Sequence, residues 1–235
     1  MPTERLTAAE RAAFVEQLRR AAPLDDADLE ALAADTRVRP VPARAHFLRT
    51  GDVAVDCGTV LVGLVREYFP LEDGREVTRG FAGPGSYVGS LSDLISGEPA
   101  RSSVIAEVDS RIAVVPWRRI RELAAQRPAW AGFIARVTER LYLAKAAREY
   151  ELLALDAEAR YDRFRTQYAA LEPVIALRHV ASYLGITPEH LSRLRRRLGL
   201  ATVAPPARGG AAVRGGRAGA AGRRARPRLG KRVPG

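Results

Sequence analysis

Cysteine is almost absent from this sequence of 235 residues, in which Cys57 is the single example. One thiol excludes a disulfide within the chain, and it also excludes zinc or iron–sulfur sites built only from this chain's cysteines. We expect Cys57 to be a buried structural thiol, with a redox role as the alternative.

Long hydrophobic runs are also lacking, since no stretch of about 18 apolar residues is free of charge. The opening residues 1–6 do not have the basic and then apolar order of a signal peptide. These absences predict a cytoplasmic protein that has no membrane partner.

Sequence signatures of catalysis are missing too. The chain contains three histidines and has no H-E-x-x-H, G-x-S-x-G or P-loop lysine motif. Gly83, Gly85 and Gly89 do not have the G-x-G-x-x-G spacing of a dinucleotide site. We therefore predict that the protein is not an enzyme and has neither catalytic residues nor a metal site.

Positive charge is abundant but uneven. Of the net charge of +11, nine basic residues and no acidic residue lie in 199–235, whereas the rest of the chain holds 29 basic and 27 acidic residues. The basic segment either contacts nucleic acid or only reflects a composition of Gly, Ala, Arg and Pro. Because 203–235 shows no hydrophobic periodicity, we predict a disordered basic tail there.

The remaining sequence divides by its hydrophobic pattern. Residues 1–23 predict an N-terminal helix that begins at the capping box of Thr7 and Glu10, and Asp25 or Asp26 can cap a second short helix. From 24 to 118, short strand-like runs alternate with turns, and Asp73-Gly74 joins the runs 60–68 and 76–81 as a hairpin. This spacing favours a barrel or sandwich over alternating strands and helices.

Residues 119–155 read as a helical linker, in which Pro128 separates a short helix from a long one. The long helix carries an apolar stripe that Arg148 interrupts, and the stripe exceeds the length that one small core needs. We predict a dimerisation helix; the alternative is the inner face of an ordinary core helix. The predicted contact residues are Ile134, Val137, Leu141 and Ala144.

Residues 156–202 contain the most informative pattern, the segment 177–198. Gly185 is placed to end one short helix, and Thr187-Pro188-Glu189 has the cap, first-turn proline and acidic residue that begin another. Small Ala181 lets the two helices cross closely. The apolar positions expected to be buried are Val180, Leu184, Ile186, Leu191 and Leu194. This combination predicts a helix-turn-helix.

The second of these helices is expected to expose Glu189, His190, Ser192, Arg193, Arg195, Arg196 and Arg197. In a major groove its first residues would face base edges and its later arginines would face phosphates. The alternative is a helical hairpin with a basic, solvated face. The predicted DNA-binding residues are Thr187, Glu189, His190, Ser192, Arg193 and Arg196.

Over about residues 24–198 the sequence predicts a β-rich part, then one long helix and then a helix-turn-helix. This order resembles the Crp/Fnr family of bacterial transcription regulators. The resemblance implies an α+β protein with a jelly-roll-like, cyclic-nucleotide-binding β-roll in 24–118, a dimerisation helix and a C-terminal winged helix-turn-helix. Because Gly199–Val203 continues directly into the basic tail, we expect a reduced or missing wing, which the tail would replace.

Two stretches resemble the family's phosphate-binding cassette, namely 85–91 and 99–104. They imply an effector site of Gly89, Ser90, Leu91, Arg101 and Ser102. Cyclic-AMP binders of the family hold the ribose with a glutamate where Ser90 stands here. A cyclic nucleotide, another small effector and no ligand therefore all stay open, and no cofactor is predicted. For Arg101 the alternative is an ion pair with Glu98 or Asp93.

Glu189-His-Leu-Ser192-Arg193 matches the E-x-x-S-R pattern of the family's oxygen-responsive branch, which implies palindromic TTGA-like sites. That branch senses oxygen with a cysteine cluster, which Cys57 alone cannot supply. The sequence thus predicts a homodimeric, sequence-specific DNA-binding regulator whose partners are double-stranded DNA, a second copy, RNA polymerase and a small effector. The alternative is a ligand-binding or protein-interaction module with a decayed DNA-binding domain.

Overall fold

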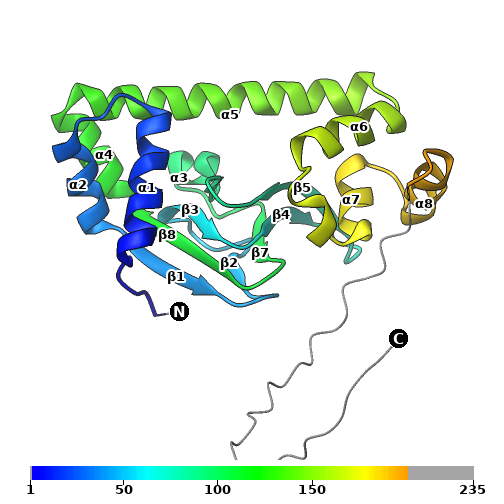
Figure 1. Cartoon of the computed structure of the whole chain (residues 1–235), viewed down its shortest axis with the longest axis horizontal. Coiled ribbons are helices and arrows are strands. Elements are labelled where there is room, and N and C mark those ends of the chain that lie inside the picture. Colours follow the sequence, from blue (N-terminus) through cyan, green and yellow to red (C-terminus); the bar gives the residue numbers. More distant parts are fainter. Residues whose placement is uncertain (1, 201–235) are drawn as a thin grey trace, which may run out of the picture. The chain divides into compact units, whose positions relative to one another are not determined.

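The computed structural model describes residues 2–200. The predicted basic tail 203–235 and the predicted wing region beyond Leu200 lie outside these residues. Figure 1 shows the order of the elements along the chain. The helices are α1 (Ala8–Ala21), α2 (Asp26–Asp35), α3 (Leu91–Ser96), α4 (Trp117–Gln126), α5 (Pro128–Ala154), α6 (Ala157–Gln167), α7 (Leu177–Leu184) and α8 (Pro188–Arg197), with a short 3₁₀ helix at Glu172–Val174.

Within residues 2–200, eight strands form two antiparallel sheets of four strands each. The strands are β1 (Arg37–Val41), β2 (His46–Leu48), β3 (Asp56–Val62), β4 (Val65–Pro70), β5 (Glu76–Ala82), β6 (Tyr87–Val88), β7 (Ser103–Ala106) and β8 (Ser110–Pro116). The first sheet has the order β1-β8-β3-β6 and the second has the order β2-β7-β4-β5. Buried side chains from both sheets, among them Val60, Val65, Val104 and Ile112, pack together between them.

The predicted hairpin is confirmed, because β4 pairs antiparallel with β5 from Val65 opposite Ala82 to Pro70 opposite Glu76. The single strand predicted over 60–68 is wrong. Gly63 has φ +100° and separates β3 from β4, which belong to different sheets. A Cβ atom at Gly63 would lie 2.3 Å from the Ser110 Oγ, so only glycine fits this turn.

Helix starts follow the predicted capping residues. The Thr7 hydroxyl accepts from the Glu10 N–H while the Glu10 carboxylate accepts from the Thr7 N–H, as a capping box requires. Asp25, rather than Asp26, caps α2, and Asp156 caps α6. Each cap satisfies an N–H group that has no partner inside its own helix.

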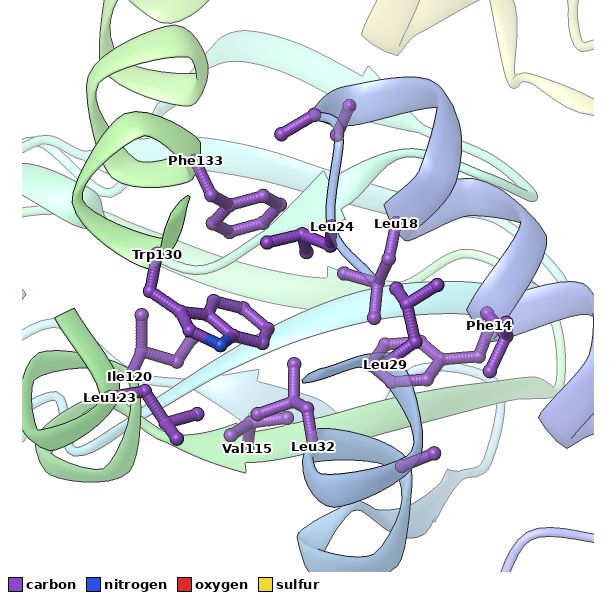
Figure 2. Packing of buried hydrophobic residues seen from close by; sticks show 14 of the residues in the cluster. Phe14, Leu18, Leu24, Leu29, Leu32, Val115, Ile120, Leu123, Trp130 and Phe133 are labelled. Carbon is purple, nitrogen blue, oxygen red and sulfur yellow. The ribbon is translucent and has the colours of Figure 1, made fainter. Parts of the chain in front are cut away.

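A first helical core packs α1, α2, α4 and the start of α5 against β8. Figure 2 shows Trp130 and Phe133 of α5 beside Ile120, Leu123, Leu18 and Leu24 in this core. The Trp130 side chain is fully buried, and its Nε1 donates to the Asp28 Oδ1 at 3.0 Å. This core therefore ties the first half of α5 to the N-terminal helices.

A second helical core joins α6, α7 and α8. It includes Phe81 of β5, whose ring contacts Phe164, Tyr168 and Tyr183. The helix α5 has 27 residues and runs from α4 to α6, as predicted from Pro128 onward (Figure 1). None of the helices between residues 2 and 200 is both long enough and apolar enough to cross a membrane.

Candidate DNA-contacting and ligand-binding sites

The pair α7–α8 has the local structure that its sequence predicts. Gly185 ends α7 in the left-handed region with φ +68°, and the Thr187 hydroxyl accepts from the His190 N–H at 3.2 Å at the start of α8. The positions Val180, Leu184, Leu191 and Leu194 are buried, whereas Ile186 is half-buried. The turn at Gly185 and the shared buried residues thus fix α8 against α7, and the opposite side of α8 is exposed to solvent.

All six predicted DNA-contacting residues lie on the exposed side of α8 or at its start, namely Thr187, Glu189, His190, Ser192, Arg193 and Arg196. A hydrogen bond from its own backbone N–H, and then the Thr187 side chain, lower the pKa of Glu189. Glu189 is therefore an ionised acceptor at neutral pH. These six residues carry one carboxylate, one imidazole, two hydroxyls and two guanidinium groups.

The expectation that Arg195 is exposed is wrong. Its side chain is buried, and its Nη1 donates to the Tyr161 hydroxyl and to the Glu172 Oε1, the latter at 3.1 Å. Arg195 therefore holds α8 to α6 and to the 3₁₀ helix, instead of facing a ligand.

Sequence reasoning missed a polar contact between α7 and the second sheet. The Ser182 hydroxyl accepts from the Thr78 N–H and donates to the Glu76 carbonyl oxygen, both at 2.9 Å. Nearby, His179 lies 3.1 Å from Glu107, which also accepts from buried Arg66 at 2.6 Å. These residues are far apart in sequence, so no local pattern indicates the contact.

The first half of the predicted cassette forms a turn into α3. Gly89 has φ +119°, and Ser90 is the N-cap residue before Leu91. The buried Ser90 hydroxyl is 3.1 Å from the Ser92 hydroxyl and makes no capping bond to the helix. A serine at this position offers no carboxylate for a ribose.

The two residues of the second half of the predicted cassette make different contacts. The side chain of Arg101 is 80% exposed, and its Nε lies 3.9 Å from the Asp93 Oδ1, which matches the ion-pair alternative with Asp93. Buried Ser102 donates to the Glu67 carboxylate at 2.7 Å, and that carboxylate also pairs with Arg79.

These contacts do not fit a cyclic nucleotide. Ser102, which would donate to the phosphate, is already bound to Glu67, and a negative carboxylate stands beside it. Sequence reasoning missed Glu67 and Arg79, although opposite charges near facing positions of a predicted hairpin were a usable signal.

A cavity of about 450 Å³ lies between the strands, α1, α3, α4 and α5. Three of the four residues predicted for the dimer contact, Ile134, Val137 and Leu141, line it and are half-buried, whereas Ala144 is exposed. Cys57 also lines the cavity, and its thiol donates to the Val115 carbonyl oxygen at 3.4 Å. Burial raises the pKa of the Cys57 thiol to about 12, so the thiol is protonated at neutral pH.

Comparison with known sequences identifies one family. Residues 38–127 match the profile of the family described as Cyclic nucleotide-binding domain, which overlaps the predicted segment 24–118. A search of curated proteins finds no match.

Solved structures with a similar fold cover most of the chain. FixK2 from Bradyrhizobium japonicum is 22% identical, covering 70% of this chain and 84% of that one, with a TM-score of 0.61. The c-di-GMP-responsive global regulator CLP from Xanthomonas campestris is 21% identical, covering 74% and 92%, with a TM-score of 0.61. The catabolite activator protein of Thermus thermophilus is 23% identical, covering 78% and 86%, with a TM-score of 0.50.

At these identities the structural matches show the fold, and the profile match adds the family of the β-rich segment. Residues 38–127 are therefore similar in sequence to the cyclic nucleotide-binding domain family, within a chain whose fold is similar to those of these three proteins.

Proposed function

We propose that this protein is a sequence-specific, DNA-binding transcription regulator of the Crp/Fnr type, whose helix-turn-helix is α7–α8. The observation that carries the proposal is the exposed face of α8, where Glu189, Ser192 and Arg193 stand free of the core. Arginine can bind guanine O6 and N7 together, and glutamate can accept from cytosine N4. The similar fold of CLP, a c-di-GMP-responsive global regulator, supports the same assignment.

The proposed regulator is a homodimer that pairs through α5. Leu143 and Tyr150 are 65% and 54% exposed, and together with Ala147 they recur at helical spacing on one face. Ile134, Val137 and Leu141 line the cavity instead. The exposed α5 face of Leu143, Ala147 and Tyr150 is therefore the pairing surface we propose, beside the predicted Ala144.

Two paired copies would place two α8 helices in successive major grooves. The expected operator is a palindrome whose half-sites lie about 34 Å apart, one turn of DNA. RNA polymerase is the proposed partner on the promoter. A small effector that binds the β-roll would shift the equilibrium between two arrangements of the helix-turn-helix units of the dimer.

Binding to sheared genomic DNA, followed by sequencing of the retained fragments, tests this function. The full chain at near-physiological salt should enrich fragments that share a palindrome, and Arg193→Ala should lose that enrichment. Arg121→Ala is the matched control, because Arg121 is an exposed arginine on α4. If wild-type protein retains fragments with no shared motif, the proposal fails and the decayed-module alternative takes its place.

The basic segment beyond residue 203 makes a separate prediction. Because its nine basic residues carry no balancing acid, we expect it to add contacts to phosphates that are independent of sequence. Deleting 204–235 should weaken binding to all DNA and flatten the dependence of log K on log salt. An unchanged salt slope would show that this segment does not contact DNA.

A further inference from the structure

We infer that Arg148 of α5 and Ser182 of α7 are positioning residues for DNA recognition. Together they hold α7 to the long helix and to the edge of the second sheet, and so set the orientation of α8 and the half-site spacing that a dimer accepts. We call these two residues the α7 clamp. The inference rests on the proposed function for its effect on DNA, whereas the contacts of the α7 clamp are measured on the protein alone.

Arg148 interrupts the apolar stripe of α5, and its contacts explain the interruption. Its side chain is 18% exposed, its Cζ atom lies 3.8 Å from the centroid of the Tyr183 ring, and its Nη2 donates to the Tyr183 carbonyl oxygen. That oxygen belongs to the last turn of α7, where a carbonyl group has no partner inside the helix and a positive charge is favourable. Arg148 therefore fixes the end of α7 to α5.

The guanidinium group of Arg148 is itself held in place. Its Nη1 donates at 3.0 Å to the carboxylate of Glu151, which lies three residues later on α5 and is 10% exposed. The same carboxylate lies 3.7 Å from the Nη1 of Arg163 on α6. A carboxylate buried to this extent needs such partners, so the position of Arg148 is determined by its own helix and by α6.

Ser182 fixes the same helix to the second sheet. The strand β5 is at the edge of this sheet, so the backbone groups on its outer side have no neighbouring strand. The Ser182 hydroxyl accepts from the N–H of buried Thr78 and donates to the Glu76 carbonyl oxygen, both at 2.9 Å. One hydroxyl of α7 therefore takes the place of a neighbouring strand at this point of the edge.

The covalent connection alone does not orient α7 and α8. Only Leu155 and Asp156 lie between the end of α5 and the start of α6 (Figure 1). Because α6, α7 and α8 share one core, rotation at this connection would turn them as a unit. Phe81 of β5 also packs against this core, but apolar packing is non-directional, whereas hydrogen bonds fix an angle.

Hydrogen exchange of the Thr78 amide tests the α7 clamp without DNA. Ser182→Ala removes the acceptor and should speed this exchange in the full chain by about fivefold or more. Arg148→Ala changes neither group of that hydrogen bond, but it should speed the same exchange because α7 is loosened. Arg148→Lys keeps a donor and the charge and should restore slow exchange. Thr166→Ala, which removes an exposed hydroxyl bonded inside α6, is the control.

Operator spacing tests the positioning role. Anisotropy titrations would compare the selected palindrome with the same DNA lengthened or shortened by about one base pair between its half-sites. Wild type should bind the altered DNAs about tenfold or more weakly, whereas Arg148→Ala and Ser182→Ala should lose less than about threefold. Both variants should keep the base preference within a half-site, because α8 is unchanged.

Two results would overturn the inference. One is Thr78 exchange in Arg148→Ala that equals that of wild type. The other is an affinity lost by the same factor at every spacing in both variants, which is the result expected of a general loss of stability. If the retained genomic fragments share no palindrome, the proposed function and the positioning role fail together. If wild type selects a palindrome and the variants keep its spacing preference, only this inference fails.

Discussion

Arg195 is a buried cation inside a run of exposed arginines on α8. Its neighbours Arg193 and Arg196 face solvent, whereas Arg195 donates to Tyr161 and Glu172. Burial and the hydrogen bond with Glu172 raise the pKa of Tyr161 to about 12, so the phenol stays neutral and can accept from the guanidinium. One face of α8 therefore holds the helix to its neighbours, and the opposite face is exposed to solvent.

Replacing Arg195 with alanine should destabilise the protein by about 2–3 kcal/mol, because it leaves Tyr161 and Glu172 without their charged donor. Arg196→Ala, an exposed position one residue later, should change stability by less than about 0.5 kcal/mol. Urea unfolding of the two variants measures both. Equal stabilities would mean that the Arg195 contacts contribute nothing to the fold.

Arg193→Ala should weaken binding to the selected operator by about 1–3 kcal/mol and relax the choice of one base in each half-site. Fluorescence anisotropy on operator and on random DNA gives the two affinities, with Arg121→Ala as the charge-matched control. An equal loss on both DNAs would assign Arg193 to a phosphate and remove it from base reading.

The contacts that could be predicted from the sequence are those between residues close together in the chain. Thr7, Asp156 and Thr187 cap helices because each bonds an N–H three residues later, and such spacing is visible in the sequence. Arg195 could not be placed, because Tyr161 and Glu172 lie 34 and 23 residues earlier in the chain.

At the scale of elements, α7 is held to the second sheet by a polar contact that reaches β7 and β8. Glu107, between these strands, accepts from Arg66 of β4 and bonds His179 of α7. Burial by itself would raise the pKa of Glu107. The hydrogen bonds and charges of His179 and Arg66 together lower this pKa by more than burial raises it, so the net shift is downward. The Glu76 carboxylate also forms an ion pair with the Arg66 guanidinium, and it adds a second negative charge beside Arg66.

The sign of this shift makes a pH prediction. A carboxyl whose pKa is lowered by folding stabilises the protein above its unfolded value of 4.5, and this contribution is lost as the pH falls through the lower folded value. Glu107→Gln should therefore destabilise the protein at pH 7 and have a smaller effect below pH 4.5. Urea unfolding at both pH values checks this, and an effect that grows in acid would contradict it.

A pairing between neighbouring strands could be predicted from the sequence, whereas pairings between distant strands could not. The hairpin β4–β5 follows from Asp73-Gly74, a turn that the local sequence determines. Gly63 lies inside a continuous apolar run, so its turn was hidden, and the strand orders of the sheets depend on distant pairings such as β1 with β8. For the same reason Tyr87 and Trp117 meet one cavity without any motif that links them.

At the scale of the whole molecule, α5 is the helix that would connect the proposed effector with the proposed DNA contact. The same helix lines the cavity with Val137 and Leu141 and presents Leu143 and Tyr150 to solvent. A ligand that changes the position of α5 would therefore act on the surface that we propose joins two copies.

Charged residues on that surface should separate the copies. We expect the double variant Leu143→Glu, Tyr150→Glu to sediment as a monomer at concentrations where wild type is a dimer, with unchanged circular dichroism because both positions are exposed. Sedimentation velocity measures the state, and Tyr142→Glu, an exposed tyrosine on the cavity side of α5, is the control. A double variant that stays dimeric would place the interface elsewhere.

The spacing of the operator tests the central claim, a dimer that reads two half-sites with two copies of α8. Anisotropy titrations would compare the selected palindrome with the same DNA lengthened by about five base pairs between its half-sites, half a turn of the helix. The account predicts that this insertion reduces affinity almost to that of random DNA, because the second α8 then meets the wrong side of the duplex. Equal affinity for the two DNAs would contradict it.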